Sequence, residues 1–230
     1  MKTELGTLYG VGVGPGDPGL VTLRAVEVVR AAATVAYPVN REGAASRALD
    51  VIAGHLPEDT RRLPLLMPMT RDRDRLRQSH QAAAAELVRA GASGDIACLT
   101  LGDPLFYSTF GYLAGKYPGP VKIVSGVTAA SAMAAAVGLP LAEGDTPTVV
   151  VTGADPEGLA AALELGASTI IIKPRSMPPL SFDILDEYGV WDRACAAAEL
   201  GGAKERVMTM LSREAAQDLP YFAVMWIRPR

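Results

Sequence analysis

The segment GVGVGPGDPGLVT, residues 10–22, has the residue types of a ligand-binding turn between a strand and a helix. Three of its glycines match the GxGxxG pattern with which dinucleotide-binding proteins hold a pyrophosphate. However, Pro15 and Pro18 remove two of the backbone N–H groups that would bind the pyrophosphate, and Asp17 would place a carboxylate beside it. The pattern therefore argues against NAD or FAD. A tight turn that only needs glycine torsions remains an alternative.

A second segment, LTLGDPLFYST at residues 99–109, ends an apolar strand with glycine, aspartate and proline, followed by aromatic and hydroxyl side chains. Ligands of open α/β sheets bind beyond the carboxyl ends of the strands, so this loop lies where a binding site is expected. The alternative is an Asx-type turn in which Asp103 only caps the helix that follows.

A third segment, SGVTAASA at residues 125–132, also follows a strand, and its small residues allow the backbone to approach a ligand closely. The alternative is helix packing without a ligand. Lys173 ends the apolar run STIIIKP, where it is either a ligand contact or a surface lysine. His55 and His80 are isolated, and no cluster has the spacing of metal ligands or of a nucleophilic triad. We therefore expect no metal and assign no catalytic residue.

Short β-branched runs alternate with Ala/Leu-rich segments, which predicts an α/β fold with two α/β domains, residues 1–125 and 126–230. In the first domain we expect strands at 7–13, 34–37, 62–66, 95–99 and 121–124, and helices at 20–32, 44–54 and 72–91. In the second we expect strands at 148–152, 168–173, 195–200, 206–210 and 222–227, with helices between the first four. The last strand lacks a crossover helix, so it should pair antiparallel and make this sheet mixed.

Composition limits the possible partners. The 22 Lys and Arg against 25 Asp and Glu give a formal charge of -3, which argues against nucleic acid and anionic membranes. Cys98 and Cys195 lack metal-ligand or CxxC spacing, so we expect reduced core thiols. No apolar leader or membrane-spanning run is present in the sequence, which predicts a cytoplasmic protein without a membrane partner.

The three motifs, in this order over nearly the whole chain, resemble those of the tetrapyrrole methylases. The stretch YPVN with Ser46 and Ala48, the run LPLLMPMTRD and the strand end IIIKPR resemble a branch that methylates a meso carbon of a reduced tetrapyrrole on the route to cobalamin. The resemblance implies S-adenosylmethionine held in a cleft between the two domains, and a homodimer. The sequence departs from the family at Ser125, where proline is usual, and around Gly201, in ELGGAKER.

The resemblance also implies which residues bind each ligand. Cofactor contacts are expected at Leu101, Gly102, Asp103, Phe106, Ser108, Thr109, Thr128, Ala129, Lys173 and Gly201. Tetrapyrrole contacts are expected at Pro15, Gly16, Asp17, Tyr37, Arg41 and Arg71. Arginine suits the many carboxylates of the tetrapyrrole, although the charges at 71–75 also fit a solvated helix start.

Alternatives within the fold are a methylase of another tetrapyrrole carbon, of a diphthamide precursor or of ribosomal RNA. An RNA substrate should show a basic surface, which the net charge disfavours. From other classes, an NAD-linked oxidoreductase and a non-catalytic ligand-binding module remain. The motifs do not distinguish a metal-free tetrapyrrole from its cobalt complex, and we favour the metal-free one.

Overall fold

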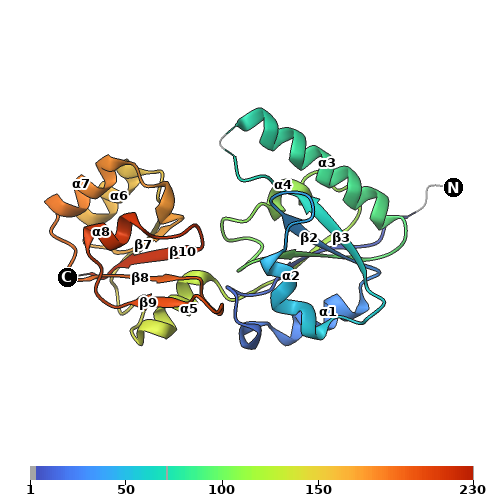
Figure 1. Cartoon of the computed structure of the whole chain (residues 1–230), viewed down its shortest axis with the longest axis horizontal. Coiled ribbons are helices and arrows are strands. Elements are labelled where there is room, and N and C mark those ends of the chain that lie inside the picture. The colour runs from blue at the N-terminus through green and yellow to red at the C-terminus, as the bar shows by residue number, and fades with distance from the viewer. Residues whose placement is uncertain (1–3, 71, 230) are drawn as a thin grey trace. The chain divides into compact units, whose positions relative to one another are not determined.

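The structure is a computed structural model that describes residues 4–70 and 72–229 (Figure 1). It divides into two compact units, residues 1–128 and 129–230. This division and the boundary predicted after residue 125 both fall in the loop between strand β5 (Val121–Val124) and helix α5 (Ala129–Val137).

Unit 1 contains a five-stranded sheet of order β3-β2-β4-β1-β5, in which every pairing is parallel. Besides β5, its strands are β1 (Leu8–Gly12), β2 (Thr34–Val39), β3 (Arg61–Leu66) and β4 (Ile96–Thr100). Its helices are α1 (Leu23–Ala31), α2 (Arg47–Ile52), α3 (Arg73–Gly91) and α4 (Phe110–Ala114), with 3-10 turns η1 (Pro18–Leu20) and η2 (Ala53–His55).

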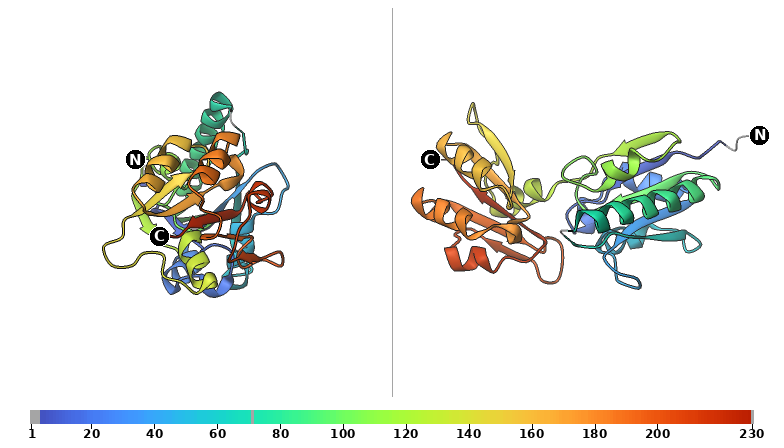
Figure 2. Two further views of the ribbon diagram at one scale, coloured as in Figure 1. Left: turned by 90° about the vertical axis from the view of Figure 1, so that its left-hand side faces the viewer. Right: turned by 90° about the horizontal axis from the view of Figure 1, so that it is seen from above.

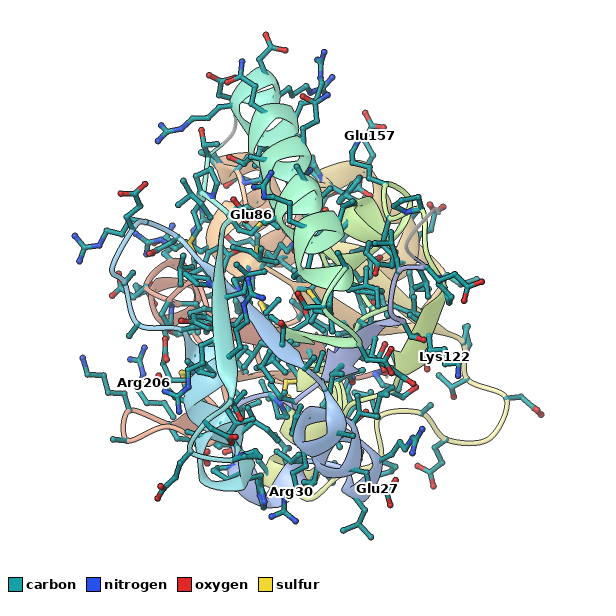
Figure 3. All side chains as sticks on the ribbon, turned by 90° about the vertical axis from the view of Figure 1, so that its right-hand side faces the viewer. Glu27, Arg30, Glu86, Lys122, Glu157 and Arg206 are labelled. Carbon is teal, nitrogen blue, oxygen red and sulfur yellow. The ribbon has the colours of Figure 1, made fainter. Side chains whose placement is uncertain are left out.

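The helices of unit 1 cover both faces of the sheet (Figure 1). Side chains alternate across a strand, so one face of β1 presents Val11 to the core formed with Val28 of α1 and with α2. The opposite face presents Leu8 to a second core with Leu87 of α3 and Phe110 of α4. Arg30, labelled in Figure 3, donates from Nε to the carbonyl of His55 at 3.1 Å and ties α1 to η2.

Two predicted boundaries in unit 1 are wrong. The helix expected at 20–32 begins only at Leu23, because Thr22 caps it by accepting the N–H of Ala25 at 3.1 Å. The strand expected at 34–37 continues through Pro38 to Val39. The proline is tolerated because the pairing of β2 with β4 ends at Ala36, and only β3 accompanies β2 beyond that point.

Unit 2 contains a second five-stranded sheet, of order β6-β7-β10-β8-β9. Its strands are β6 (Thr148–Thr152), β7 (Ser168–Ile172), β8 (Ala194–Ala198), β9 (Arg206–Met208) and β10 (Ala223–Ile227). Besides α5, its helices are α6 (Pro156–Glu164), α7 (Pro179–Glu187) and α8 (Arg213–Gln217), with the 3-10 turn η3 (Pro174–Ser176).

The prediction of a mixed sheet with an antiparallel last strand is confirmed, because β10 pairs antiparallel with both β7 and β8. Helices α6, α7 and α8 cover one face of this sheet, and α5 lies on the other (Figures 1 and 2). The expected helix order is wrong in one place. β8 and β9 pair antiparallel without a helix between them, and the short helix α8 precedes β10 instead. None of the described helices has the length and apolarity needed to cross a membrane.

Candidate functional site

The three glycine-containing motifs lie at the carboxyl ends of three neighbouring strands of unit 1. β1 runs parallel between β4 and β5, with Gly12 opposite Thr100 and Val11 opposite Val124. The loops that follow these strands therefore leave the sheet at the same edge. Open parallel sheets bind their ligands at that edge.

Four glycines bring the backbones of these loops into direct contact, and we call Gly12, Gly14, Gly102 and Gly126 the glycine junction. Gly14 and Gly102 form an isolated antiparallel bridge. A Cβ built on Gly12 would lie 2.6 Å from the carbonyl oxygen of Gly102, and one on Gly126 would lie 2.2 Å from the same oxygen. Any side chain at either position would therefore force the loops apart.

Gly102 differs from the other junction glycines in what surrounds it. A Cβ built there meets nothing within 4 Å, so this position faces open space. Its φ of 76° lies in the left-handed region, which side-chain-bearing residues rarely adopt. Gly102 thus exposes bare backbone at the strand end, where a ligand can approach without meeting a side chain.

The carboxylate of Asp103 joins the second motif to the third. Its Oδ1 accepts the N–H of Leu105 at 2.8 Å, and its Oδ2 accepts the N–H of Gly126 at 3.0 Å. The Asx-type turn considered from the sequence is present, but Asp103 caps no helix, because α4 begins only at Phe110. The side chain of Asp103 is therefore already occupied by backbone donors.

Hydroxyl groups connect the two ends of the second motif through hydrogen bonds. The Thr100 and Ser108 hydroxyls lie 2.9 Å apart, and Ser108 Oγ also accepts the N–H of Phe110 at 3.1 Å. Within the loop, Leu101 and Phe106 are half-buried and Thr109 is exposed. Thr109 occupies the N-cap position of α4, but its side chain accepts no hydrogen bond from the N–H groups of the first turn.

The predicted substrate residues of the first motif differ in exposure. Pro15 and Gly16 are buried, whereas Asp17 is exposed and accepts the N–H of Gly19 at 2.8 Å. They directly follow Gly14 and so adjoin the glycine junction.

Two further predicted substrate residues lie in β2 and in the loop that follows it. Tyr37 is half-buried and packs against the core under α1 and α2, and Arg41 is exposed in the loop after the strand. Because β2 is parallel to β4, this loop leaves the sheet at the same edge as the motifs. Arg71 lies outside the described residues. Arg73 and Arg75 are exposed in the first turn of α3, which Asp72 caps at 2.9 and 3.1 Å.

Four predicted cofactor residues belong to the connection between the units and to unit 2. Thr128 directly precedes α5 and Ala129 is its first residue. Lys173 follows β7 and is exposed, and its carbonyl accepts the Ser176 hydroxyl at 2.8 Å. Gly201 follows β8 in a turn with φ of 70°.

Three residues other than glycine have a strained, left-handed backbone conformation. Tyr107, Lys173 and Glu199 have φ of 51°, 53° and 55°, although none is glycine. Such conformations cost about 1–3 kcal/mol each and gather at functional sites. Each of the three follows the carboxyl end of a strand, namely β4, β7 and β8. Only Lys173 was expected, because a left-handed torsion at a tyrosine or glutamate leaves no mark on the sequence.

Two titratable side chains of unit 1, Cys98 and His80, are not placed to act as a general acid or base. Burial raises the pKa of the Cys98 thiol to about 12, so it stays protonated. Partial burial and the nearby Lys116 lower the pKa of His80, whose ring stacks on Tyr112 at 5.0 Å. Within residues 4–70 and 72–229, no group of three or more His, Cys, Asp or Glu side chains could hold a metal ion. The arrangement suits binding and alignment of ligands by backbone.

Relatives named as C(20)-methyltransferases resemble the chain over almost its full length. The precorrin-2 C(20)-methyltransferase of Sinorhizobium sp. is 33% identical over 97% of this chain and 95% of that protein. The cobalt-precorrin-2 C(20)-methyltransferase of Salmonella typhimurium is 29% identical over 96% of both chains.

Solved structures share the fold. The uroporphyrin-III C-methyltransferase of Thermus thermophilus, in complex with S-adenosylhomocysteine, has a TM-score of 0.69 at 22% identity and covers 97% of each chain. Cobalt precorrin-4 methyltransferase has a TM-score of 0.71 at 17% identity, over 96% of this chain and 94% of that one. The family model of the Tetrapyrrole (Corrin/Porphyrin) Methylases matches residues 7–216. The chain therefore belongs to the tetrapyrrole methylase family.

Proposed function

We propose that this enzyme transfers a methyl group from S-adenosylmethionine to C-20 of precorrin-2 and so makes precorrin-3A in cobalamin biosynthesis. Two relatives named for C(20) methylation of precorrin-2 or its cobalt complex align over at least 95% of their length and of this chain. The NAD-linked alternative disagrees with the family and with the two prolines of the first motif.

The observation that carries the proposal is the glycine junction. Gly102 offers backbone that faces open space, between loops that Gly14 and Gly126 hold in place. The loop that contains Gly102 suits S-adenosylmethionine, because Leu101 and Phe106 offer apolar surface to an aromatic ring and Ser108 offers a hydroxyl to polar groups. The proposed cofactor contacts are Leu101, Gly102, Asp103, Phe106, Ser108, Thr109, Thr128, Ala129, Lys173 and Gly201.

S-adenosylmethionine supplies a methyl group that a sulfonium centre already activates. The protein therefore needs no nucleophile of its own, and its residues bind and orient the two reactants. Alignment of this kind can lower a barrier by roughly 7–11 kcal/mol. The glycine junction contributes a rigid backbone surface, since its spacing is fixed by direct backbone contacts.

Arginines beyond the carboxyl edge of the first sheet would bind the carboxylates of the tetrapyrrole. Arg41 is exposed in the loop after β2, and Arg73 and Arg75 are exposed at the start of α3. Arginine donates two parallel hydrogen bonds to a carboxylate. The proposed substrate contacts are Pro15, Gly16, Asp17, Tyr37, Arg41 and Arg71.

We also propose that the enzyme is a cytoplasmic homodimer. Free thiols persist in reducing compartments, and Cys98 and Cys195 are both free and buried. Unit 1 exposes Leu105 at 70% and Tyr112 at 62%, apolar surface that a partner could cover. Light scattering at micromolar concentration should give the dimer mass, and a monomer mass would contradict this part of the proposal.

Calorimetric titration with S-adenosylhomocysteine, followed by mass spectrometry and NMR of the product from precorrin-2, tests the activity. The expected result is saturable binding and a single new methyl at C-20. Methylation at another carbon would reject the proposed position while keeping the family. Turnover on metal-free and cobalt-loaded precorrin-2 should favour the metal-free form, and the reverse order would assign the enzyme to the cobalt substrate.

A further inference from the structure

The chain passes once from unit 1 to unit 2, through the loop 125–128 between β5 and α5, which we call the connector. The connector follows an edge strand, because β5 pairs only with β1. Its first residue, Ser125, is exposed, so no deep burial holds this end of the loop. Its attachment to unit 1 therefore depends on local contacts.

Gly126 is a close contact between the connector and the loops after β1 and β4. A Cβ on Gly126 would lie 2.8 Å from the Cα of Gly12, so the two backbones touch. A hydrogen bond also attaches the connector to the loop after β4, because the Gly126 N–H donates to Asp103 Oδ2 at 3.0 Å. Hydrogen bonds to a carboxylate are roughly twice as strong as neutral ones.

Asp103 is suited to this task because its other oxygen is fixed as well. Oδ1 accepts the N–H of Leu105 at 2.8 Å, which holds the carboxylate in one orientation within its own turn. The two bonds together tie the loop after β4 to the connector, across 23 residues of sequence.

We propose that Asp103 is a positioning residue that anchors Gly126 of the connector and so holds in place the backbone that leads to Thr128. Thr128 and Ala129, two of the proposed cofactor contacts, follow Gly126 by only two and three residues. Asp103 then acts on the cofactor through the Gly126 backbone. This inference rests on the proposed function, since it assigns the connector a place in the cofactor site.

Three variants separate anchoring from the other possible roles of Asp103. Asp103→Asn keeps one acceptor oxygen but points an NH₂ group at the second N–H, so one of the two bonds is lost. Asp103→Ser can still accept the Leu105 N–H in its own turn, but it is too short to bridge to Gly126. Asp155→Asn is the matched control, because Asp155 in unit 2 also accepts one backbone N–H, that of Gly158 at 2.9 Å.

Hydrogen–deuterium exchange of the ligand-free protein is the first measurement. Asp103→Asn should speed exchange at whichever of the Gly126 and Leu105 amides faces its NH₂ group. In Asp103→Ser, the Gly126 amide should exchange at least about tenfold faster than in wild type, as loss of a charged hydrogen bond implies. In Asp155→Asn it should be unchanged. If Asp103 acted only by touching the cofactor, exchange at Gly126 would be the same in all variants, and the proposal would be overturned.

Binding and kinetics form the second measurement. We expect Asp103→Ser to bind S-adenosylhomocysteine about tenfold more weakly, and its KM for S-adenosylmethionine to rise more than its KM for the tetrapyrrole. A merely structural role would lower the melting temperature without this difference between the two substrates. Faster exchange at Gly126 with unchanged cofactor affinity would overturn the positioning role. If wild type bound no S-adenosylhomocysteine at all, the proposed function would fail, while the exchange result would still report on the anchor.

Discussion

The N–H of Gly102 donates to the carbonyl oxygen of Gly14 at 2.7 Å, and the N–H of Gly14 donates back to Gly102 at 3.3 Å. These bonds form an antiparallel bridge at the edge of a sheet whose strands all run parallel. These two backbone hydrogen bonds join the first motif directly to the second.

Replacement of Gly102 by valine should weaken S-adenosylhomocysteine binding about tenfold to hundredfold, corresponding to about 1–3 kcal/mol. The added carbons would occupy the open space at this position. Valine must also adopt a φ of 76°, so some stability is lost as well. Gly102→Ala is the control, since it carries the torsional strain with little bulk. Equal calorimetric affinities for wild type and valine variant would place the cofactor elsewhere.

Gly126→Ala should destabilise unit 1 by about 1–3 kcal/mol, because its Cβ would lie 2.2 Å from a backbone oxygen that cannot rotate away. Gly111→Ala serves as its control. A Cβ on Gly111 meets nothing within 4 Å, and alanine favours helix by up to about 1 kcal/mol over glycine. Chemical denaturation of both variants measures the difference. A Gly126→Ala protein as stable as wild type would show that the junction is looser than described.

Asp186 should make stability depend on pH in the acidic range. The Trp191 indole N–H, 2.6 Å away, and then Arg213 hold its pKa below the ordinary value. A depressed folded-state pKa stabilises the fold above the ordinary value, and the contribution is lost as pH falls through the depressed one. Asp186→Asn should therefore lower the melting temperature near neutral pH but converge on wild type in acid. Glu187→Gln is the control, because it removes a carboxylate from an exposed position next to Asp186.

Both cysteines should resist thiol reagents in the folded protein. Burial raises the pKa of Cys98 to about 12 and that of Cys195 to about 11, so little thiolate forms at the mildly alkaline pH of such assays. Ellman titration should detect no rapid reaction in native protein and two thiols after denaturation. Fast reaction of either thiol in the native state would show that its strand opens.

The sequence predicted the strand ends and turns of the candidate site, because its motifs are local. Glycine, proline and aspartate after an apolar run predict a strand end and a turn without reference to the rest of the chain. The fold class followed from alternation of strand and helix patterns, and the mixed second sheet is confirmed.

What the sequence could not predict depends on contacts between distant residues. The bond from Gly126 to Asp103 exists only because β1 places the ends of β4 and β5 on either side of itself. Pro38 lies within a strand only because β4 leaves β2 before that point. The left-handed torsions of Tyr107 and Glu199 likewise come from the surrounding fold and not from residue type.

The position of β1 also bears on protein synthesis. β1 is made first among the strands, yet both of its neighbours, β4 and β5, are made last in unit 1. During translation, β1 and Gly14 therefore have no backbone partner until residues 96–126 have left the ribosome. Pairings between such distant segments form slowly, and exposed strand edges invite aggregation. The loops of the glycine junction thus assemble only near the end of the first unit's synthesis.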